Sequence, residues 1–248
     1  MKPEIMKRRV GFSLLILVLI ISVAGCNKKT GIPVQISEIS GETDIQNNKY
    51  AIVEIENFGT LKFKLFDKYA PLEVESFCNL VNEGFFDDKP VYMIIKDFCF
   101  FSGDKNSGER INNAGNSGTA ENKKISLYPL RGALCLTDGN DTDGYTCGNF
   151  SVIQTSAQFL SELEELLKYK KVTLQEYIKQ AYGADLDNDT LEIFTKYGGA
   201  PWLYGHCKVF GQLVEGGDVL DRICSMEVSD DANFSPMEDI VIESIIIQ

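Results

Sequence analysis

The sequence predicts a mainly β domain over residues 50–248, with two helices and an inserted helical segment. Several short runs alternate apolar with charged residues, which is the pattern of half-buried strands. Two short stretches instead carry apolar residues at helical spacing, one after the second expected strand and one before the last. A longer stretch of helical periodicity, at about residues 155–198, interrupts the strands and is the expected insertion.

The first strands and the first helix follow one another closely. In AIVEIENFGTLKFKLF, residues 51–66, apolar and charged residues alternate on both sides of Asn57-Phe58-Gly59. Two such runs joined by a short link predict a β-hairpin. A helix is expected from Pro71, which suits a first helical position, to Gly84, which favours a helix stop. Further strands are expected at residues 91–95, 98–101, 131–136, 149–153, 208–213 and 239–247, and a second helix at residues 218–224.

The insertion between Gln154 and Pro201 is predicted to be helical. SAQFLSELEELLKYKK, which begins it, has its leucines on one face at helical spacing. Thr173 followed by Glu176 forms a capping box ahead of a second helix. A third short helix is expected to begin near Asp189. We interpret the segment as a helical hairpin whose apolar stripe forms a local core, with a docking surface as the alternative.

The N-terminal residues predict export and a lipid anchor. A basic stretch ending at Arg9 precedes the apolar run GFSLLILVLIISVAG, which meets Cys26. The run is short for a membrane span, which needs about 20 residues. Its ending is typical of a lipoprotein signal, in which the cysteine is diacylated and becomes the mature N-terminus. We therefore expect residues 1–25 to be a lipoprotein signal peptide, with an uncleaved anchor helix as the alternative.

The segment after the signal is expected to separate the domain from the membrane. Residues 26–49 are polar and aperiodic, which predicts a flexible tether. Both readings of the N-terminus place the remaining chain outside the cytoplasmic membrane. The expected location is extracytoplasmic, anchored to the cell membrane through lipidated Cys26.

Charge and metal-ligand patterns exclude several classes of function. The formal net charge of −12 argues against nucleic acid as a partner and against electrostatic docking on anionic lipid. The single histidine, His206, and the absence of a CxxC pair fit no zinc pattern. Acidic loops at residues 141–143 and 185–189 do not complete a calcium-binding pattern. For the cysteines we favour free buried thiols over a disulfide framework, although an exported location permits disulfides.

Two segments resemble the signature segments of the cyclophilins, a family of peptidyl-prolyl cis-trans isomerases. They are VYMIIKDFCFFSGD, residues 91–104, and PWLYGHCKVFG, residues 201–211. The resemblance covers about residues 50–153 and 199–248. It implies a closed eight-stranded antiparallel barrel capped by two helices, with binding on the outer face, because side chains fill so small a barrel. The helical insertion is expected to pack beside the binding groove.

The resemblance also assigns site residues. The family's catalytic arginine falls on Met93, and its supporting glutamine falls on Phe101. Lys96, His206 and Lys208 are nearby in sequence, but their spacing places none of them over a prolyl nitrogen. The substrate-binding positions implied by the resemblance are Phe98, Cys99, Asp138, Asn149, Ser151, Trp202, Leu203 and Cys207.

The expected function is peptidyl-prolyl isomerisation of exported chains, with weak activity. The family's arginine donates a hydrogen bond to the prolyl nitrogen, which weakens amide conjugation, and methionine cannot donate. One alternative is a non-catalytic peptide-binding module, or chaperone-like lipoprotein, that uses the same groove. Another is a scaffold that acts through the insertion. The resemblance implies no cofactor or metal, proline-containing peptides or exported protein chains as partners, and a monomer.

Overall fold

The structure, a computed structural model, describes residues 49–104, 110–112, 127–138 and 144–248. The predicted signal peptide, Cys26 and all of the predicted tether except Lys49 lie outside these residues. Among the residues that are described, no helix is long and apolar enough to cross a membrane.

The described elements follow the predicted order closely. The strands are β1 (Tyr50–Ile55), β2 (Gly59–Leu65), β3 (Lys89–Ile95), β4 (Cys99–Gly103), β5 (Arg110–Asn112), β6 (Ala133–Asp138), β7 (Gly144–Ile153), β8 (Lys208–Glu215) and β9 (Val241–Ile247). The helices are α3 (Pro71–Asn82), α4 (Ala157–Tyr169), α5 (Leu174–Tyr182), α6 (Asn188–Tyr197) and α7 (Gly217–Cys224), with a 3-10 turn, η2 (Pro201–Leu203). The hairpin link between β1 and β2 has Asn57 and Gly59 at positive φ, where these residue types are favoured.

The strands form a closed antiparallel barrel, which confirms the predicted fold. Neighbouring strands run in the order β4-β3-β9-β1-β2-β8-β6-β7, and pairing of β4 with β7 closes the ring. The short strand β5, which the sequence did not predict, pairs with β7 outside this ring. Closure removes the exposed edges that an open sheet of eight strands would present.

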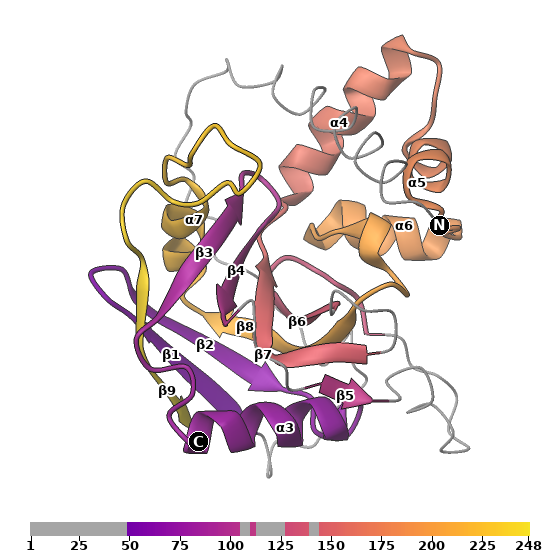
Figure 1. Cartoon of the computed structure of the whole chain (residues 1–248). Helices are drawn as coiled ribbons and strands as arrows, with labels where there is room; N and C mark the ends of the chain where they lie inside the picture. Colours follow the sequence, from indigo (N-terminus) through magenta and orange to yellow (C-terminus); the bar gives the residue numbers. More distant parts are fainter. Residues whose placement is uncertain (1–48, 105–109, 113–126, 139–143) are drawn as a thin grey trace.

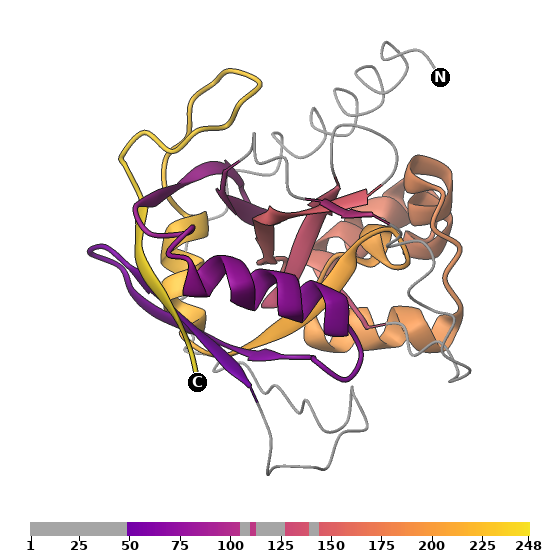
Figure 2. The ribbon, with the colours of Figure 1, turned by 60° about the horizontal axis from the view of Figure 1, so that its bottom comes forward.

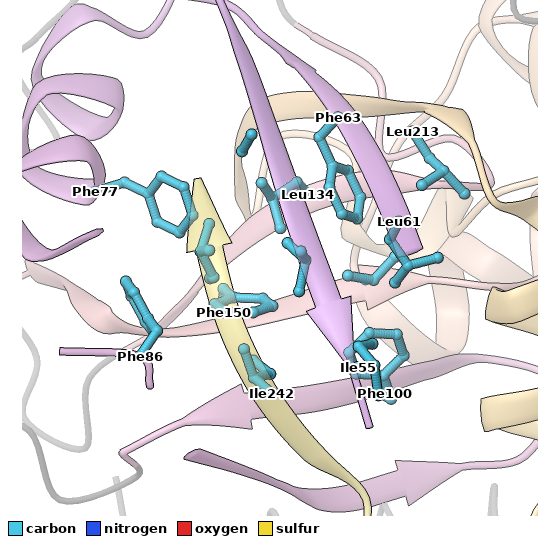
Figure 3. Close-up of a cluster of buried hydrophobic side chains, with 14 of the residues drawn as sticks. Ile55, Leu61, Phe63, Phe77, Phe86, Phe100, Leu134, Phe150, Leu213 and Ile242 are labelled. Atoms are coloured by element: carbon cyan, nitrogen blue, oxygen red, sulfur yellow. The ribbon is translucent and has the colours of Figure 1, made fainter. Parts of the chain in front are cut away.

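Side chains fill the barrel, as expected for eight strands. Phe63, Phe100, Leu134 and Phe150 lie in one buried cluster, which Figure 3 shows between the strands. Phe77 of α3 extends this cluster, with its ring centroid 5.1 to 6.1 Å from those of three other buried phenylalanines. A filled interior leaves the outer face as the place where a ligand can bind.

Two helices complete the core, as predicted. Helix α3 packs against β7 and β9, and Figures 1 and 2 show it lying across the barrel. Helix α7 packs against β2, β3 and β4, with Val219, Leu220 and Ile223 buried.

The insertion forms a separate helical layer beside the barrel (Figure 1). Its two ends meet, because the Gly199 amide donates to the Thr155 carbonyl at 2.8 Å. Gly198 has a φ of +75°, and a Cβ there would lie 2.6 Å from the same carbonyl oxygen, so this crossing requires glycine. The predicted capping box of Thr173 and Glu176 is present at the start of α5.

The insertion has its own hydrophobic core, as predicted. Leu163, Leu167, Leu174 and Ile178 are buried together between α4 and α5. A second small cluster joins Leu160 of α4 and Phe194 of α6 to Leu130, which precedes β6. The apolar stripe of α4 therefore packs inward, and the insertion is held to the barrel by side chains as well as by its two ends.

Candidate active site

A second buried cluster lies on the outside of the barrel wall. Phe100 and Leu134 point into the barrel, whereas their chain neighbours Cys99 and Cys135 belong to the second cluster. Since successive side chains of a strand point to opposite faces, this cluster is on the outer face. We call it the outer cluster. Its buried members are Phe66, Cys99, Ala133, Cys135, Ile153, Ala200 and Val209, and Tyr69, Ile95, Phe98, Phe101, Leu127, Trp202, Leu203 and Cys207 pack against it.

Four outward positions line up across neighbouring strands. Met93 on β3 is directly opposite Phe101 on β4. Phe101 in turn is opposite Ser151 on β7, and Ser151 is opposite Cys135 on β6. Directly opposite residues place their side chains on the same face, with Cβ atoms about 4.5–5.5 Å apart. The positions predicted for the catalytic arginine and its supporting glutamine are therefore neighbours, as the predicted site requires.

The two signature segments meet at the outer cluster. Phe98, Cys99, Trp202, Leu203 and Cys207, all predicted to bind substrate, belong to it. Phe98 and Trp202 have ring centroids 5.4 Å apart. The structure thus brings together side chains that are about a hundred positions apart in the sequence.

The remaining predicted positions lie further along β6 and β7. Asn149 is buried and directly opposite Gly103, two positions from Ser151 along β7. Asp138 ends β6, where it pairs with Tyr145; its side chain is outside what the structure describes.

Tyr92 is a further candidate site residue, which the sequence did not predict. Its hydroxyl donates to Asn149 Oδ1 at 2.7 Å, so this β3 side chain reaches past β4 to β7. Its ring centroid is 6.3 Å from that of Phe101. Burial raises the pKa of the Tyr92 hydroxyl to about 12, although the hydrogen bond to Asn149 acts in the opposite direction. The hydroxyl is therefore protonated, and a donor, at neutral pH.

The residues at positions 101 and 151 both differ from those that the resemblance implies, and the pairing of β4 with β7 relates the two differences. The cyclophilin resemblance implies glutamine on β4 and a pocket phenylalanine on β7. Here β4 has Phe101 and β7 has Ser151, and these two residues are directly opposite each other. An aromatic ring is thus retained at this place, but it comes from the neighbouring strand. The residue directly opposite Met93 is therefore an aromatic ring and not a glutamine amide.

The cysteines of the outer cluster are packing residues. A hydrogen bond with Cys207, together with burial, raises the pKa of the Cys135 thiol, and burial raises the pKa of Cys99. Nucleophilic cysteines need a lowered thiol pKa, so these two are inert at neutral pH. The six cysteines in the described part of the chain are thiols, and five of them are buried.

Several charged or titratable side chains outside the outer cluster either hold structural contacts or face solvent. Arg131, before β6, donates to the Gln154 carbonyl at 2.5 Å and to Asp221 Oδ1 at 2.6 Å, which ties the barrel wall to α7. Lys96 and His206 are solvent-exposed. In the acidic loop before α6, Asp187 caps that helix.

A closed barrel with an apolar, tryptophan-containing site on its outer face defines a protein of the cyclophilin class. Comparison with known proteins agrees. Residues 50–247 match the family model described as cyclophilin type peptidyl-prolyl cis-trans isomerase/CLD. A Staphylococcus epidermidis protein with the provisional name peptidyl-prolyl cis-trans isomerase is 31% identical over 212 residues, covering 83% of this chain and 95% of its own. A Staphylococcus aureus protein of the same name is 26% identical over 207 residues, with 83% and 95% coverage.

Solved structures show the same fold. A cyclophilin type peptidyl-prolyl cis-trans isomerase of Cryptosporidium parvum superposes with a TM-score of 0.55 at 19% identity, over 82% of this chain and 98% of that one. A second structure of that enzyme, in the presence of the dipeptide Ala-Pro, gives a TM-score of 0.54 at 19% identity, over 80% of this chain and 98% of that one. The chain belongs to the cyclophilin-type peptidyl-prolyl cis-trans isomerase family. Its family activity is the isomerisation of X-Pro bonds.

The Tyr92 hydroxyl gives a pH-dependent prediction. Tyr92→Phe leaves the buried Asn149 Oδ1 without this donor, so we expect the free energy of unfolding to fall by about 1–2 kcal/mol near neutral pH. A pKa of about 12 in the native state lies above the unfolded value of about 10. The stabilisation is therefore fully present below pH 10 and is lost as the pH rises through about 12. Urea unfolding at several pH values measures this difference.

The control for this prediction is Tyr169→Phe, because Tyr169 is 87% exposed and its hydroxyl faces water. It should match the unsubstituted protein at every pH. A Tyr92→Phe deficit that stays constant from pH 8 to pH 12 would show that the hydroxyl is not the stabilising group.

Proposed function

We propose that this protein is a weak peptidyl-prolyl isomerase that holds proline-containing segments of exported chains at the outer cluster. The observation that carries this proposal is Met93, which occupies the arginine position directly opposite Phe101. Amide resonance sets a barrier of about 18–20 kcal/mol to rotation of the peptide bond. A donor aimed at the prolyl nitrogen lowers this barrier, and Met93 has no group to donate.

The expected loss of rate is large but not complete. One preorganised donor to a transition state is worth about 2.7–4 kcal/mol, or a factor of about 10²–10³ in rate. Holding the proline ring against an apolar surface still favours the less conjugated bond, because the twisted amide carries less charge separation. Phe98, Phe101 and Leu203 offer such a surface.

A second candidate function is a non-catalytic peptide-binding module or chaperone-like lipoprotein. The specific observation that favours it is the exchange at positions 101 and 151, which keeps an aromatic ring for binding and removes a polar group for catalysis. Both candidates bind peptide at the same surface. They differ in whether the bound X-Pro bond isomerises faster than it does in free solution.

Isomerisation kinetics and binding, measured on one short X-Pro peptide, separate the two candidates. The weak isomerase should bind the peptide and accelerate its isomerisation. Its rate acceleration should be smaller by a factor of about 10²–10³ than that of a cyclophilin with the arginine. Binding with the uncatalysed rate supports the module. Turnover at full cyclophilin rate would show that another side chain supplies the donor. Failure to bind would contradict both candidates.

The proposed site of action is the outer surface of the cell membrane, with anchoring through lipidated Cys26. Support comes from the basic stretch and the short apolar run that precede this cysteine. Mass spectrometry of the membrane-extracted protein should find Cys26 as the first residue, with a diacylglyceryl group on its sulfur. Cys26→Ser should lose this group and keep residues 1–25. An N-terminal peptide of the unsubstituted protein that carries no lipid on Cys26 would contradict lipidation at this position.

A further inference from the structure

Aromatic rings continue from the outer cluster onto the helical insertion. The ring centroids of Phe98 and Trp202 are 5.4 Å apart, and those of Trp202 and Tyr182 are 5.7 Å apart. Tyr177 follows at 6.1 Å from Tyr182. We call these four residues the aromatic row. It begins at the barrel wall, passes through η2 and ends on α5.

The middle of the aromatic row is fixed on both sides. Trp202 packs against the outer cluster and also against both hydrophobic clusters of the insertion. Two residues later, Tyr204 stacks on Tyr128 at 5.0 Å and meets Phe194 of α6 at 6.0 Å. The tryptophan that the family places at the edge of the substrate site is therefore held in place by the insertion.

The third ring of the row, Tyr182, is accessible to a ligand. Tyr182 is the last residue of α5 and is 40% exposed, although its ring stacks on Trp202 with an interplanar angle of 28°. Gly183, at φ +77°, ends the helix here, so no further turn of α5 covers the ring. A partly exposed ring that continues a peptide-binding surface is a place for more of the same peptide.

We propose that Tyr182 and Trp202 form a second binding site for a proline that lies three residues from the proline held at the outer cluster. This inference rests on the proposed function, because it assumes that the outer cluster holds a proline-containing peptide. The occupant is an extended Pro-x-x-Pro segment of the substrate chain, and the insertion supplies the part of the surface that binds the second ring.

Chain geometry sets this spacing. A polyproline II helix has three residues per turn and rises about 3.1 Å per residue, so residues three apart share a face at about 9 Å. The two centroid steps of 5.4 and 5.7 Å place Tyr182 no more than about 11 Å from Phe98. Proline-rich segments in this conformation dock on aromatic side chains, and they lose little conformational entropy when they bind.

Peptides of equal length test the inference. One has a single proline, two have a second proline three residues before or after it, and a register control has the second proline two residues away. Binding is followed by the fluorescence of Trp202, the single tryptophan of the chain. One of the peptides with three-residue spacing should bind about three- to tenfold more tightly than the single-proline peptide, and the register control should not.

Three tyrosine variants locate the second site. Tyr182→Ala should lose the gain from the second proline, and Tyr182→Phe, which keeps the ring, should retain it. Tyr169→Ala, the same truncation at an exposed tyrosine of α4, should also retain it. The inference is overturned if three-residue spacing gives no gain, or if the gain survives Tyr182→Ala. If none of the peptides binds, the proposed function fails and the inference fails with it; single-proline binding without a gain removes the inference alone.

Discussion

Combining Met93→Arg with Phe101→Gln and Ser151→Phe is expected to raise kcat/KM for an X-Pro peptide by about 10²–10³. The arginine supplies the donor that Met93 lacks, and the glutamine directly opposite it can orient the guanidinium. Phe101→Gln removes an aromatic ring from β4, and Ser151→Phe places one at the directly opposite position on β7. Together, Phe101→Gln and Ser151→Phe nearly conserve the total side-chain volume, and packed positions tolerate volume-conserving changes best. Isomerisation kinetics at several protein concentrations measure the gain.

Two further variants show which substitution causes the gain. The first combines Met93→Leu with Phe101→Gln and Ser151→Phe. It has no donor at position 93, so its rate should stay near that of the unsubstituted protein. Met93→Arg alone should give a smaller gain than the triple variant, because Phe101 has no polar group to hold the guanidinium. A triple variant no faster than the leucine control would show that position 93 does not face the prolyl nitrogen.

The alternation of side chains explains how a barrel of this family can change its chemistry without losing its fold. Phe100 and Phe150 are buried in the core, whereas Phe101 and Ser151, the next residue of each strand, point outward. Substitutions at the outward positions leave the packing of the interior unchanged. The positions onto which the family's arginine, glutamine and pocket phenylalanine fall all lie on the outward side, so residues there can be exchanged at little cost in stability.

Most of the fold could be predicted from the sequence because its strands carry clear local patterns. The hairpin of β1 and β2 and the capping box of α5 depend on residues that are close in the chain. Strand β5 was missed because Arg110–Asn112 is too short to show alternation, and it forms only by pairing with β7. The first half of β7 was missed for a different reason: GYTCG has the composition of a turn, and a register shift between Leu136 and Thr137 interrupts its pairing with β6.

The site could be predicted less completely, because its geometry depends on strand register. The family resemblance assigned Phe98 and Trp202 to the candidate site, and the structure places their rings together. It did not identify Tyr92, which lies at a register shift between Val91 and Met93 and whose hydroxyl reaches Asn149 on β7. No spacing in the sequence reveals a contact that skips a strand.

Phe77→Ala is expected to lower the free energy of unfolding by about 3–5 kcal/mol, the largest stability effect that we predict. Phe77 is fully buried on α3, and its ring centroid lies 5.2 Å from Phe86, 6.1 Å from Phe150 and 5.1 Å from Phe210. Truncation leaves a cavity between the helix and the barrel, where rigid strands on several sides prevent collapse. Urea unfolding, followed by Trp202 fluorescence, measures the loss.

The matched control is Leu72→Ala on the same helix, because Leu72 is 46% exposed and its truncation opens no cavity. It should change the free energy of unfolding by no more than about 0.5 kcal/mol. If both variants lose the same small amount, then α3 adds little to the core and the barrel is stable without its helix. A loss confined to Phe77→Ala instead places α3 inside the cooperative unit that keeps β7 in position, and with it Asn149 and Ser151 on the outer face.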